Sequence, residues 1–306
     1  MSRSAPRSID EYLSELRAAL AGEDPALVQD ALYDAEEYLR AEVAASAGKP
    51  EADVLERIAT TYGTPDEIAA AYRDTERKVR VALQPPAPRR AATSSLAGQF
   101  FGVYTDPRAY GSLFFMFLSL ITGIVYFTFA VTGLSLSAGL SILIIGLPVF
   151  LAFIGIARAL SLGEGRLLEA VSGERMPRRP VHPGAAESFF DRILNMLKDP
   201  QTWTTLVYLI LMLPLGILYF TTAVTMLSLG VSFVLLPFAM LGQRWNWWLP
   251  WHDVGDLSVS PAWFDTPVGW IFCLIFGVVI LTTLMHLARA LVSVHAKAAK
   301  VLLVQS

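Results

Sequence analysis

Apolar residues follow two different patterns along this chain of 306 residues. Up to about residue 80 they recur every three or four positions among polar residues, a spacing typical of amphipathic helices. Farther on they form four uncharged runs, at about 112–134, 136–157, 204–228 and 268–288. Each run is long enough to cross the ~30 Å hydrocarbon core of a bilayer as a helix. The pattern predicts an all-α protein in which a small four-helix domain precedes a four-span membrane domain.

Helix-start signals support the four-helix domain, which we place at residues 8–80. Ser8 and Thr64 each stand three residues before a glutamate, the spacing of a capping box. Asp24 precedes a proline, as an N-cap residue before the first helical position often does. The proline-rich stretch 81–95 then predicts an extended linker.

The membrane part contains an internal repeat. Residues 106–136 and 199–229 share one pattern that begins with Asp-Pro, at a spacing of 93 residues. Both copies later reach an Ala-Arg-Ala-Leu sequence, there at a spacing of 131 residues. The second copy therefore carries about 38 additional residues, as an insertion at 229–267. These spacings place repeat 1 at 96–175 and repeat 2 at 176–306.

The repeats are predicted to be parallel. Each repeat supplies two spans, so both copies enter the membrane from the same side. Transporters built from inverted repeats need copies of opposite orientation. The repeat therefore argues against a transporter of that type.

Shorter segments connect or flank the spans. Residues 135–137 are the only link between the first two runs and predict a tight hairpin there. Residues 96–104 and 189–197 occupy equivalent places before the two repeats, and the amphipathic second one favours an interfacial helix or a helix packed on the small domain. Residues 231–241 are apolar but short and contain Pro237, which favours an interfacial or re-entrant segment over a span.

Charge supports this division and predicts an orientation. Hydrophobic residues make up 54% of the chain and charged residues 17%, a balance unlike that of a soluble domain. Basic residues cluster before the first run, between the second and third, and after the fourth, whereas the loop after the third run has Arg244 alone. By the positive-inside rule, both termini are cytoplasmic. The polar N-terminus has no signal peptide, so the first span must direct insertion.

Catalytic chemistry is not indicated by any motif, and we expect neither an enzyme nor a bound cofactor or metal. The predicted spans lack Asp, Glu and Lys, so they hold no ion relay, and His286 is their one titratable group, expected as a hydrogen-bonding residue. Gly269, Cys273 and Gly277 recur every fourth residue and predict a face that lets helices pack closely. The single cysteine excludes an intramolecular disulfide.

The insertion is the candidate for ligand binding. Six of the seven tryptophans lie between residues 245 and 270, beside several acids. An aromatic belt at the outer membrane surface explains such a cluster, whereas tryptophan faces near carboxylates also suit cationic amphiphiles. A metal site at His252, Asp253 and Asp256 is a further alternative. The candidate ligand-binding residues are Trp245, Trp247, Trp248, Trp251, His252, Asp253 and Asp256.

Two family resemblances add to this picture. The sequence Tyr-Gly-Thr-Pro-Asp-Glu-Ile-Ala at 62–69, preceded by Tyr-Leu-x-x-Leu at 12–16, resembles the HAAS domain. That resemblance implies a helical signalling module associated with PadR-type transcription regulators. Residues 106–295 resemble the sensor domain found in front of many actinobacterial histidine kinases, through the Asp-Pro start, a Pro-Leu-Gly sequence at 214–216 and the Ala-Arg-Ala-Leu exit. No kinase domain follows in this sequence.

Together these features predict a bacterial plasma-membrane sensor that detects envelope or membrane state. We expect its N-terminal domain to relay that state to a cytoplasmic transcription regulator or kinase, without direct contact to nucleic acid. A homo-oligomer in the lipid bilayer is left open. The alternative is a non-catalytic accessory or structural subunit, for example the partner of an exporter.

Overall fold

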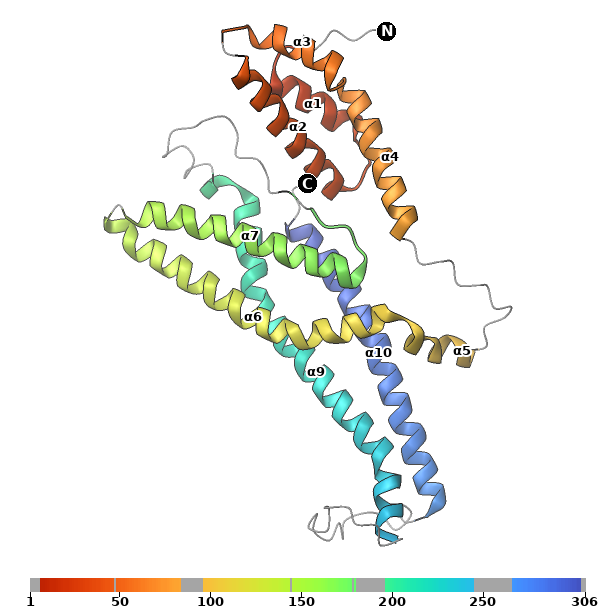
Figure 1. The fold of residues 1–306 in the computed structure, drawn as a ribbon. Coiled ribbons are helices and arrows are strands. Elements are labelled where there is room, and N and C mark those ends of the chain that lie inside the picture. The colour runs from red at the N-terminus through yellow and green to blue at the C-terminus, as the bar shows by residue number, and fades with distance from the viewer. Residues whose placement is uncertain are drawn as a thin grey trace. The chain divides into compact units, whose positions relative to one another are not determined.

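The computed structural model describes residues 6–46, 48–83, 96–143, 145–177, 179, 196–244 and 266–303. Within these ranges the chain forms helices and no strand, which confirms the all-α prediction. The helices are α1 (Ile9–Ala19), α2 (Pro25–Ala45), α3 (Glu51–Thr61), α4 (Pro65–Leu83), α5 (Leu96–Phe101), α6 (Pro107–Leu140), α7 (Gly146–Ser172), α9 (Pro200–Arg244) and α10 (Pro267–Leu303), with 3₁₀ turns η1 (Gly102–Thr105) and η2 (Ser141–Leu143). Figure 1 shows them in chain order.

Helices α1 to α4 form a small bundle with its own apolar core, drawn in red and orange in Figure 1. Helix α1 packs against α2 and α4, and α2 packs against α3. Fully buried side chains from all four helices meet in this core: Tyr12, Leu16, Leu20, Ala31, Ala35, Leu39, Val54, Leu55, Ile58 and Ala69. The apolar residues that recur every three or four positions therefore form one stripe on each helix, and the stripes of the four helices pack against one another.

The predicted caps fix where these helices begin. The Ser8 hydroxyl accepts a hydrogen bond from the Glu11 N–H at 3.1 Å, and Asp24 Oδ1 accepts one from the Ala26 N–H at 2.9 Å. At α4 the Thr64 N–H donates to Glu67 Oε2 at 2.8 Å, while Thr64 Oγ1 accepts from the Glu67 N–H at 3.4 Å. The backbone hydrogen bond from Thr64 lowers the pKa of the Glu67 carboxyl. These contacts satisfy N–H groups that a helix start otherwise leaves without partners.

In the part of the chain that the structure describes, four helices are long and apolar enough to cross a membrane: Pro107–Leu140, Gly146–Ser172, Pro200–Gly242 and Pro267–Leu303. Each is longer than the run predicted from the sequence. The backbone polar groups of a helix are satisfied within it, which makes the helix the form in which a single segment can cross an apolar medium. The chain is thus a multi-pass membrane protein.

The hairpin between the first two spans falls later than predicted. We placed the turn at 135–137, but α6 continues to Leu140, the 3₁₀ turn η2 follows at Ser141–Leu143, and α7 begins at Gly146. Small serines are tolerated inside a helix, so they did not end α6. The turn needs Gly146 instead, because a Cβ there would lie 2.2 Å from the backbone nitrogen of Ser141. The second span accordingly begins at Gly146.

The prediction of a re-entrant segment at 231–241 was wrong, whereas the alternative of an interfacial segment stays a prediction. These residues continue α9, which contains both Pro214 and Pro237 and runs to Arg244. A proline removes one N–H donor from the helix, whereas unwinding the segment would expose many backbone groups to an apolar medium. The first part of the predicted insertion is therefore helical. The predicted linker 81–95 begins too early, because residues 81–83 continue α4, and its remaining residues 84–95 lie outside the described residues. The predicted helix at 189–197 also lies outside them, apart from residues 196 and 197.

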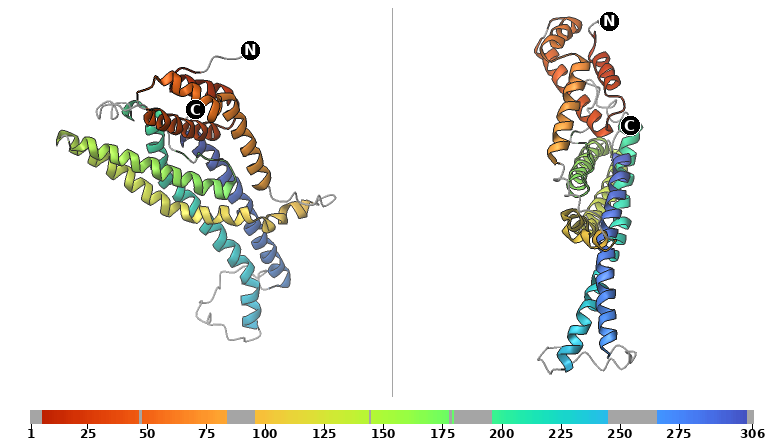
Figure 2. Two further views of the ribbon diagram at one scale, coloured as in Figure 1. Left: turned by 45° about the horizontal axis from the view of Figure 1, so that its top comes forward. Right: turned by 90° about the vertical axis from the view of Figure 1, so that its right-hand side faces the viewer.

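The chain divides into two compact units. One contains Met1–Ala92, Ala130–Tyr208 and Ala296–Ser306, and the other contains Thr93–Phe129 and Leu209–His295. In the second unit, α9 and α10 lie side by side in both views of Figure 2. A Cβ added at Gly277 would lie 2.8 Å from the carbonyl oxygen of Gly230, so the two backbones approach closely at that point.

Candidate functional site

The two sequence motifs of the repeat each begin a membrane helix with the same cap. Asp106 Oδ1 accepts a hydrogen bond from the Arg108 N–H at 2.9 Å, and Asp199 Oδ1 accepts one from the Gln201 N–H at 3.0 Å. The proline after each aspartate has no N–H to satisfy and is already set for the first helical turn. The Asp-Pro sequence is therefore a helix start in both copies.

The second oxygen of each aspartate binds an arginine of the other repeat. Arg158 Nη2 donates to Asp199 Oδ2 at 2.8 Å, and Arg289 Nη1 lies 3.2 Å from Asp106 Oδ2. The arginines are those of the two Ala-Arg-Ala-Leu sequences. The two ion pairs are therefore equivalent in the repeat: the aspartates are 93 residues apart and the arginines 131 residues apart. Each exit helix is tied to the entrance of the opposite repeat.

The two ion pairs differ in exposure. The side chains of Arg158 and Asp199 are 23% and 22% exposed. Arg158 Nη2 also donates a hydrogen bond to Thr202 Oγ1 at 3.2 Å. The side chains of Arg289 and Asp106 are 45% and 26% exposed. Because solvent screens an ion pair, the Arg158 pair is expected to be the stronger of the two.

Two glycines let α6 and α9 cross with their backbones in contact. A Cβ at Gly123 would lie 2.5 Å from the carbonyl oxygen of Met212, and a Cβ at Gly216 would lie 2.3 Å from that of Ser119. A shift of 93 residues maps Gly123 onto Gly216 and Ser119 onto Met212, so the two contacts are reciprocal. The crossing is consistent with a pseudo-twofold relation between the first helices of the repeats.

A buried titratable side chain stands at the same place in each exit helix. Glu164 in α7 is 1% exposed and His295 in α10 is 4% exposed, and the 131-residue shift relates them. The Tyr208 hydroxyl donates to Glu164 Oε1 at 3.4 Å, and the Tyr219 hydroxyl lies 3.2 Å from His295 Nδ1. Aromatic hydroxyls thus accompany both groups.

These two residues lie beyond the runs that we predicted as spans. Within those runs His286 was expected as the one titratable group, and that expectation stays a prediction. His286 does make the expected hydrogen bond, with Nε2 3.0 Å from the Phe100 carbonyl oxygen. The repeat alignment contained the missing signal, since extending it seven residues beyond the first alanine of each exit motif pairs Glu164 with His295.

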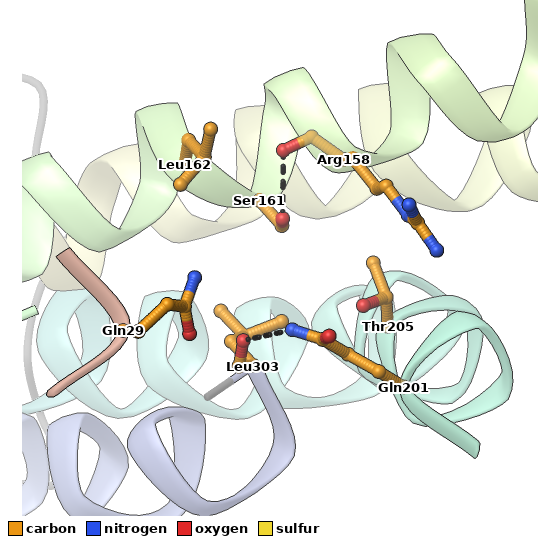
Figure 3. A pocket seen from close by; sticks show the side chains of 7 residues that line it. All are labelled: Gln29, Arg158, Ser161, Leu162, Gln201, Thr205 and Leu303. Carbon is orange, nitrogen blue, oxygen red and sulfur yellow. Dashed lines mark hydrogen bonds between the residues drawn. The ribbon is translucent and has the colours of Figure 1, made fainter. Parts of the chain in front are cut away.

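Figure 3 shows a small cavity beside the Arg158 pair, lined by Gln29, Arg158, Ser161, Leu162, Gln201, Thr205 and Leu303. Its volume of about 20 Å³ has room for about one water molecule. The Nε2 atoms of Gln29 and Gln201 donate to backbone carbonyls, whereas their buried Oε1 atoms have no protein partner. A water molecule donating to these oxygens fits the cavity, and a drug-sized ligand does not.

Comparison with family models assigns both parts of the chain. Residues 115–303, more than half of the chain, match the model of the Sensor family, described as "Putative sensor". The chain belongs to the Sensor family. Residues 11–71 match the HAAS model, so a HAAS domain precedes the Sensor-family membrane part as the resemblances implied. No curated protein and no solved structure matches the chain. This combination supports a role in membrane sensing or signalling.

The HAAS domain contacts the ends of both exit helices through acidic residues of α2. Arg175, three residues after the end of α7, donates to Asp30 Oδ2 at 3.1 Å. Lys300, near the end of α10, donates to Asp24 Oδ2 at 2.6 Å. Asp24 also caps α2, so the amine of Lys300 binds at the first turn of that helix. The HAAS domain therefore meets both repeats of the Sensor-family part.

The structure describes the predicted packing face at Gly269, Cys273 and Gly277 but not the predicted ligand-binding loop. Gly269 and Cys273 are buried, and Gly277 lies against α9. The ligand-loop candidates, Trp245, Trp247, Trp248, Trp251, His252, Asp253 and Asp256, lie outside the described residues. Among the residues described, no group of three or more His, Cys, Asp or Glu side chains is placed to hold a metal ion.

Proposed function

We propose that this protein senses the state of the cell envelope and relays it through its HAAS domain to a cytoplasmic regulatory partner. One observation carries the proposal. The acidic helix α2 binds basic residues that follow or end both exit helices, through Arg175 and Lys300. A shift of either exit helix therefore acts directly on the HAAS domain. The proposed role includes no catalytic step, cofactor or contact with nucleic acid.

The proposed partner is a PadR-type transcription regulator or a histidine kinase, as the HAAS and Sensor resemblances imply. Crosslinking of the full chain in native membranes, followed by identification of what is bound to residues 8–80, tests this. Recovery of a transcription regulator or kinase supports the proposal. Recovery of an exporter ATPase instead would favour the accessory-subunit alternative.

The proposed orientation places both termini in the cytoplasm of a bacterial cell. Single cysteines at Ser172 and at Ser258, in a Cys273→Ala background, test it with a membrane-impermeant thiol reagent on whole cells. Only the cysteine at Ser258 should react, because it lies in the loop with few basic residues. Equal labelling, or labelling at Ser172 alone, would overturn the orientation.

The proposed input is the tryptophan-rich part of the insertion. Replacing Trp247 and Trp248 with Phe should preserve assembly, because anchoring at a membrane interface tolerates other aromatic rings. If the rings bind a cationic amphiphile, the same change should abolish the response to envelope-active compounds, and Asp253→Asn with Asp256→Asn should weaken it. The readout is the partner bound to the HAAS domain with and without such compounds. An unchanged response in both variants would leave the loop as an anchor.

A further inference from the structure

The α2 face of the HAAS domain already holds a segment of this chain in the manner of a bound peptide. The segment consists of residues 175–177 and 179, which follow α7. At its start the Arg175 guanidinium lies between two carboxylates, with Nη2 3.1 Å from Asp30 Oδ2 and Nη1 in an ion pair with Glu76 of α4. At its end Arg179 Nε lies 3.0 Å from Asp34 Oδ1. Two arginines four residues apart thus meet three carboxylates.

The contact extends to the backbone and to apolar groups of the segment. The Arg179 N–H donates to Asp30 Oδ1 at 3.0 Å, and Gln29 Nε2 donates to the Arg179 carbonyl oxygen at 2.8 Å. The Arg179 guanidinium carbon also lies 5.6 Å from the centre of the Tyr33 ring, a cation–π distance. Met176 and Pro177 between the arginines are buried. Backbone clasps, paired charges and buried apolar side chains are the contacts by which domains recognise peptides.

Charge decides what else can occupy this face. Asp30 is 5% exposed, and the segment binds both of its oxygens. Removing a cation from a buried ion pair is costly, because the remaining charge stays in a poorly solvated place. The face therefore favours another arginine-bearing segment over an anionic lipid headgroup or a nucleic acid.

The segment is placed to respond to the membrane part. Helix α7 ends at Ser172, and Gly173 turns the chain with a φ of 75°, a conformation that suits glycine. Arg175 follows two residues later, so a movement of the end of α7 is passed to it over a short distance. Its far end is held less firmly, since the side chain of Arg179 is 51% exposed.

We infer that the α2 face of the HAAS domain is a peptide-binding surface for two arginines spaced four residues apart, the first of them followed by apolar residues. Arg175, Met176, Pro177 and Arg179 occupy it within the chain, and sensing releases it to an arginine-bearing segment of the partner protein. This inference rests on the proposed function and supplies the chemistry of its partner.

A binding experiment on the full chain in detergent tests the inference. The probe is a fluorescent synthetic peptide with the sequence of residues 172–182. The variant Arg175→Ala with Arg179→Ala empties the surface, and Arg166→Ala, an exposed arginine of α7, is the matched control. A tethered segment competes at an effective concentration near millimolar, so the double variant should bind the probe on the order of tenfold more tightly than wild type. The Arg166 variant should bind like wild type.

Specificity completes the test. In the double-variant background, Asp30→Asn with Asp34→Asn should abolish probe binding. A probe with alanine at the positions of Arg175 and Arg179, which keeps the third arginine of the sequence, should not bind. Equal affinity in wild type and double variant, or binding indifferent to Asp30 and Asp34, would overturn the inference. So would a mass change on emptying the surface, because it would mean that the segment binds a second copy. Helicity and melting of each variant identify loss of folding, and Arg175→Lys, which keeps the charge, should then bind the probe at an intermediate level.

The outcomes separate this inference from the proposed function. A double variant that binds the probe, in a chain from which crosslinking recovers an exporter ATPase, would keep the surface and overturn the sensing role. A transcription regulator recovered on the HAAS domain, with its binding unaffected by Asp30 and Asp34, would keep the sensing role and overturn this surface.

Discussion

The swapped ion pairs allow a quantitative test of how the two repeats are held together. Replacing Asp199 with alanine removes both its cap, worth about 1 kcal/mol, and its ion pair with Arg158. An exposed pair contributes at most about 1 kcal/mol and breaking a buried one costs about 3–5 kcal/mol. With side chains 23% and 22% exposed, the Arg158 pair should fall between these limits, at about 1–2 kcal/mol. The expected total for Asp199→Ala is therefore about 2–3 kcal/mol.

Asparagine variants separate the two contributions, because asparagine caps a helix as well as aspartate does. Asp199→Asn should lose only the ion pair, and a double-mutant cycle with Arg158→Gln should give a coupling of about 1–2 kcal/mol. The matched cycle, Asp106→Asn with Arg289→Gln, should give about 0.5 kcal/mol or less, because its arginine is 45% exposed. Unfolding by sodium dodecyl sulfate in mixed micelles, followed by circular dichroism, measures both. Equal couplings, or a larger one for Asp106, would refute the ranking by exposure.

Three further predictions concern other parts of the chain. Gly123→Ala and Gly216→Ala should each cost about 1–3 kcal/mol in the same unfolding assay, because each added Cβ would overlap a backbone carbonyl, whereas Gly155→Ala, with open space at its Cβ, should not. A fragment of residues 1–83 should unfold cooperatively, and Thr64→Ala should lower its stability by about 1 kcal/mol through loss of the α4 cap, as measured by urea denaturation. The same fragment should lose stability above pH ~10, because burial raises the pKa of Tyr12: a group whose pKa is raised on folding stabilises below its unfolded pKa and loses that contribution as pH rises. Titrating the unfolding midpoint checks this. Tyr12→Phe should reduce the alkaline loss without abolishing it, because burial also raises the pKa of Tyr62 and of Tyr72 in the same fragment.

The elements that sequence predicted correctly are those set by neighbours along the chain. The capping boxes at Ser8 and Thr64 and the cap at Asp24 involve residues only a few positions apart. Local hydrogen bonding decides such features, so they can be inferred without a partner helix. The lengths of the membrane helices could not be inferred from local signals alone. A proline such as Pro237 often ends a helix in water, but it lies inside α9, because an apolar medium offers the backbone no hydrogen-bond partners outside the helix.

The contacts of the candidate site depend on tertiary packing that one copy of the repeat does not reveal. Nothing local indicates that Asp106 pairs with Arg289, 183 residues later, instead of with Arg158 of its own repeat. The repeat did single out both arginines and both aspartates, because the same residues occur in both copies while much of the surrounding sequence differs. The repeat gave no comparable indication for Arg175. It counted toward the positive-inside rule as one charge among several, and its contacts with Asp30 and Glu76 follow from where the HAAS domain folds.

The swapped pairs also bear on how a signal would pass between the repeats. Because each exit arginine binds the aspartate at the entrance of the other repeat, a movement of an exit helix away from that aspartate would strain its ion pair. The two links are unequal, since the Arg289 pair is the more exposed and thus the weaker. Arg289 belongs to the repeat that carries the insertion, where we place the input. Under the proposed function, a stimulus acting there would first loosen the Arg289 pair on α10, the helix whose Lys300 binds Asp24 at the start of α2. Release of Arg175 from α2 would follow once the stronger Arg158 pair also breaks and the end of α7 moves.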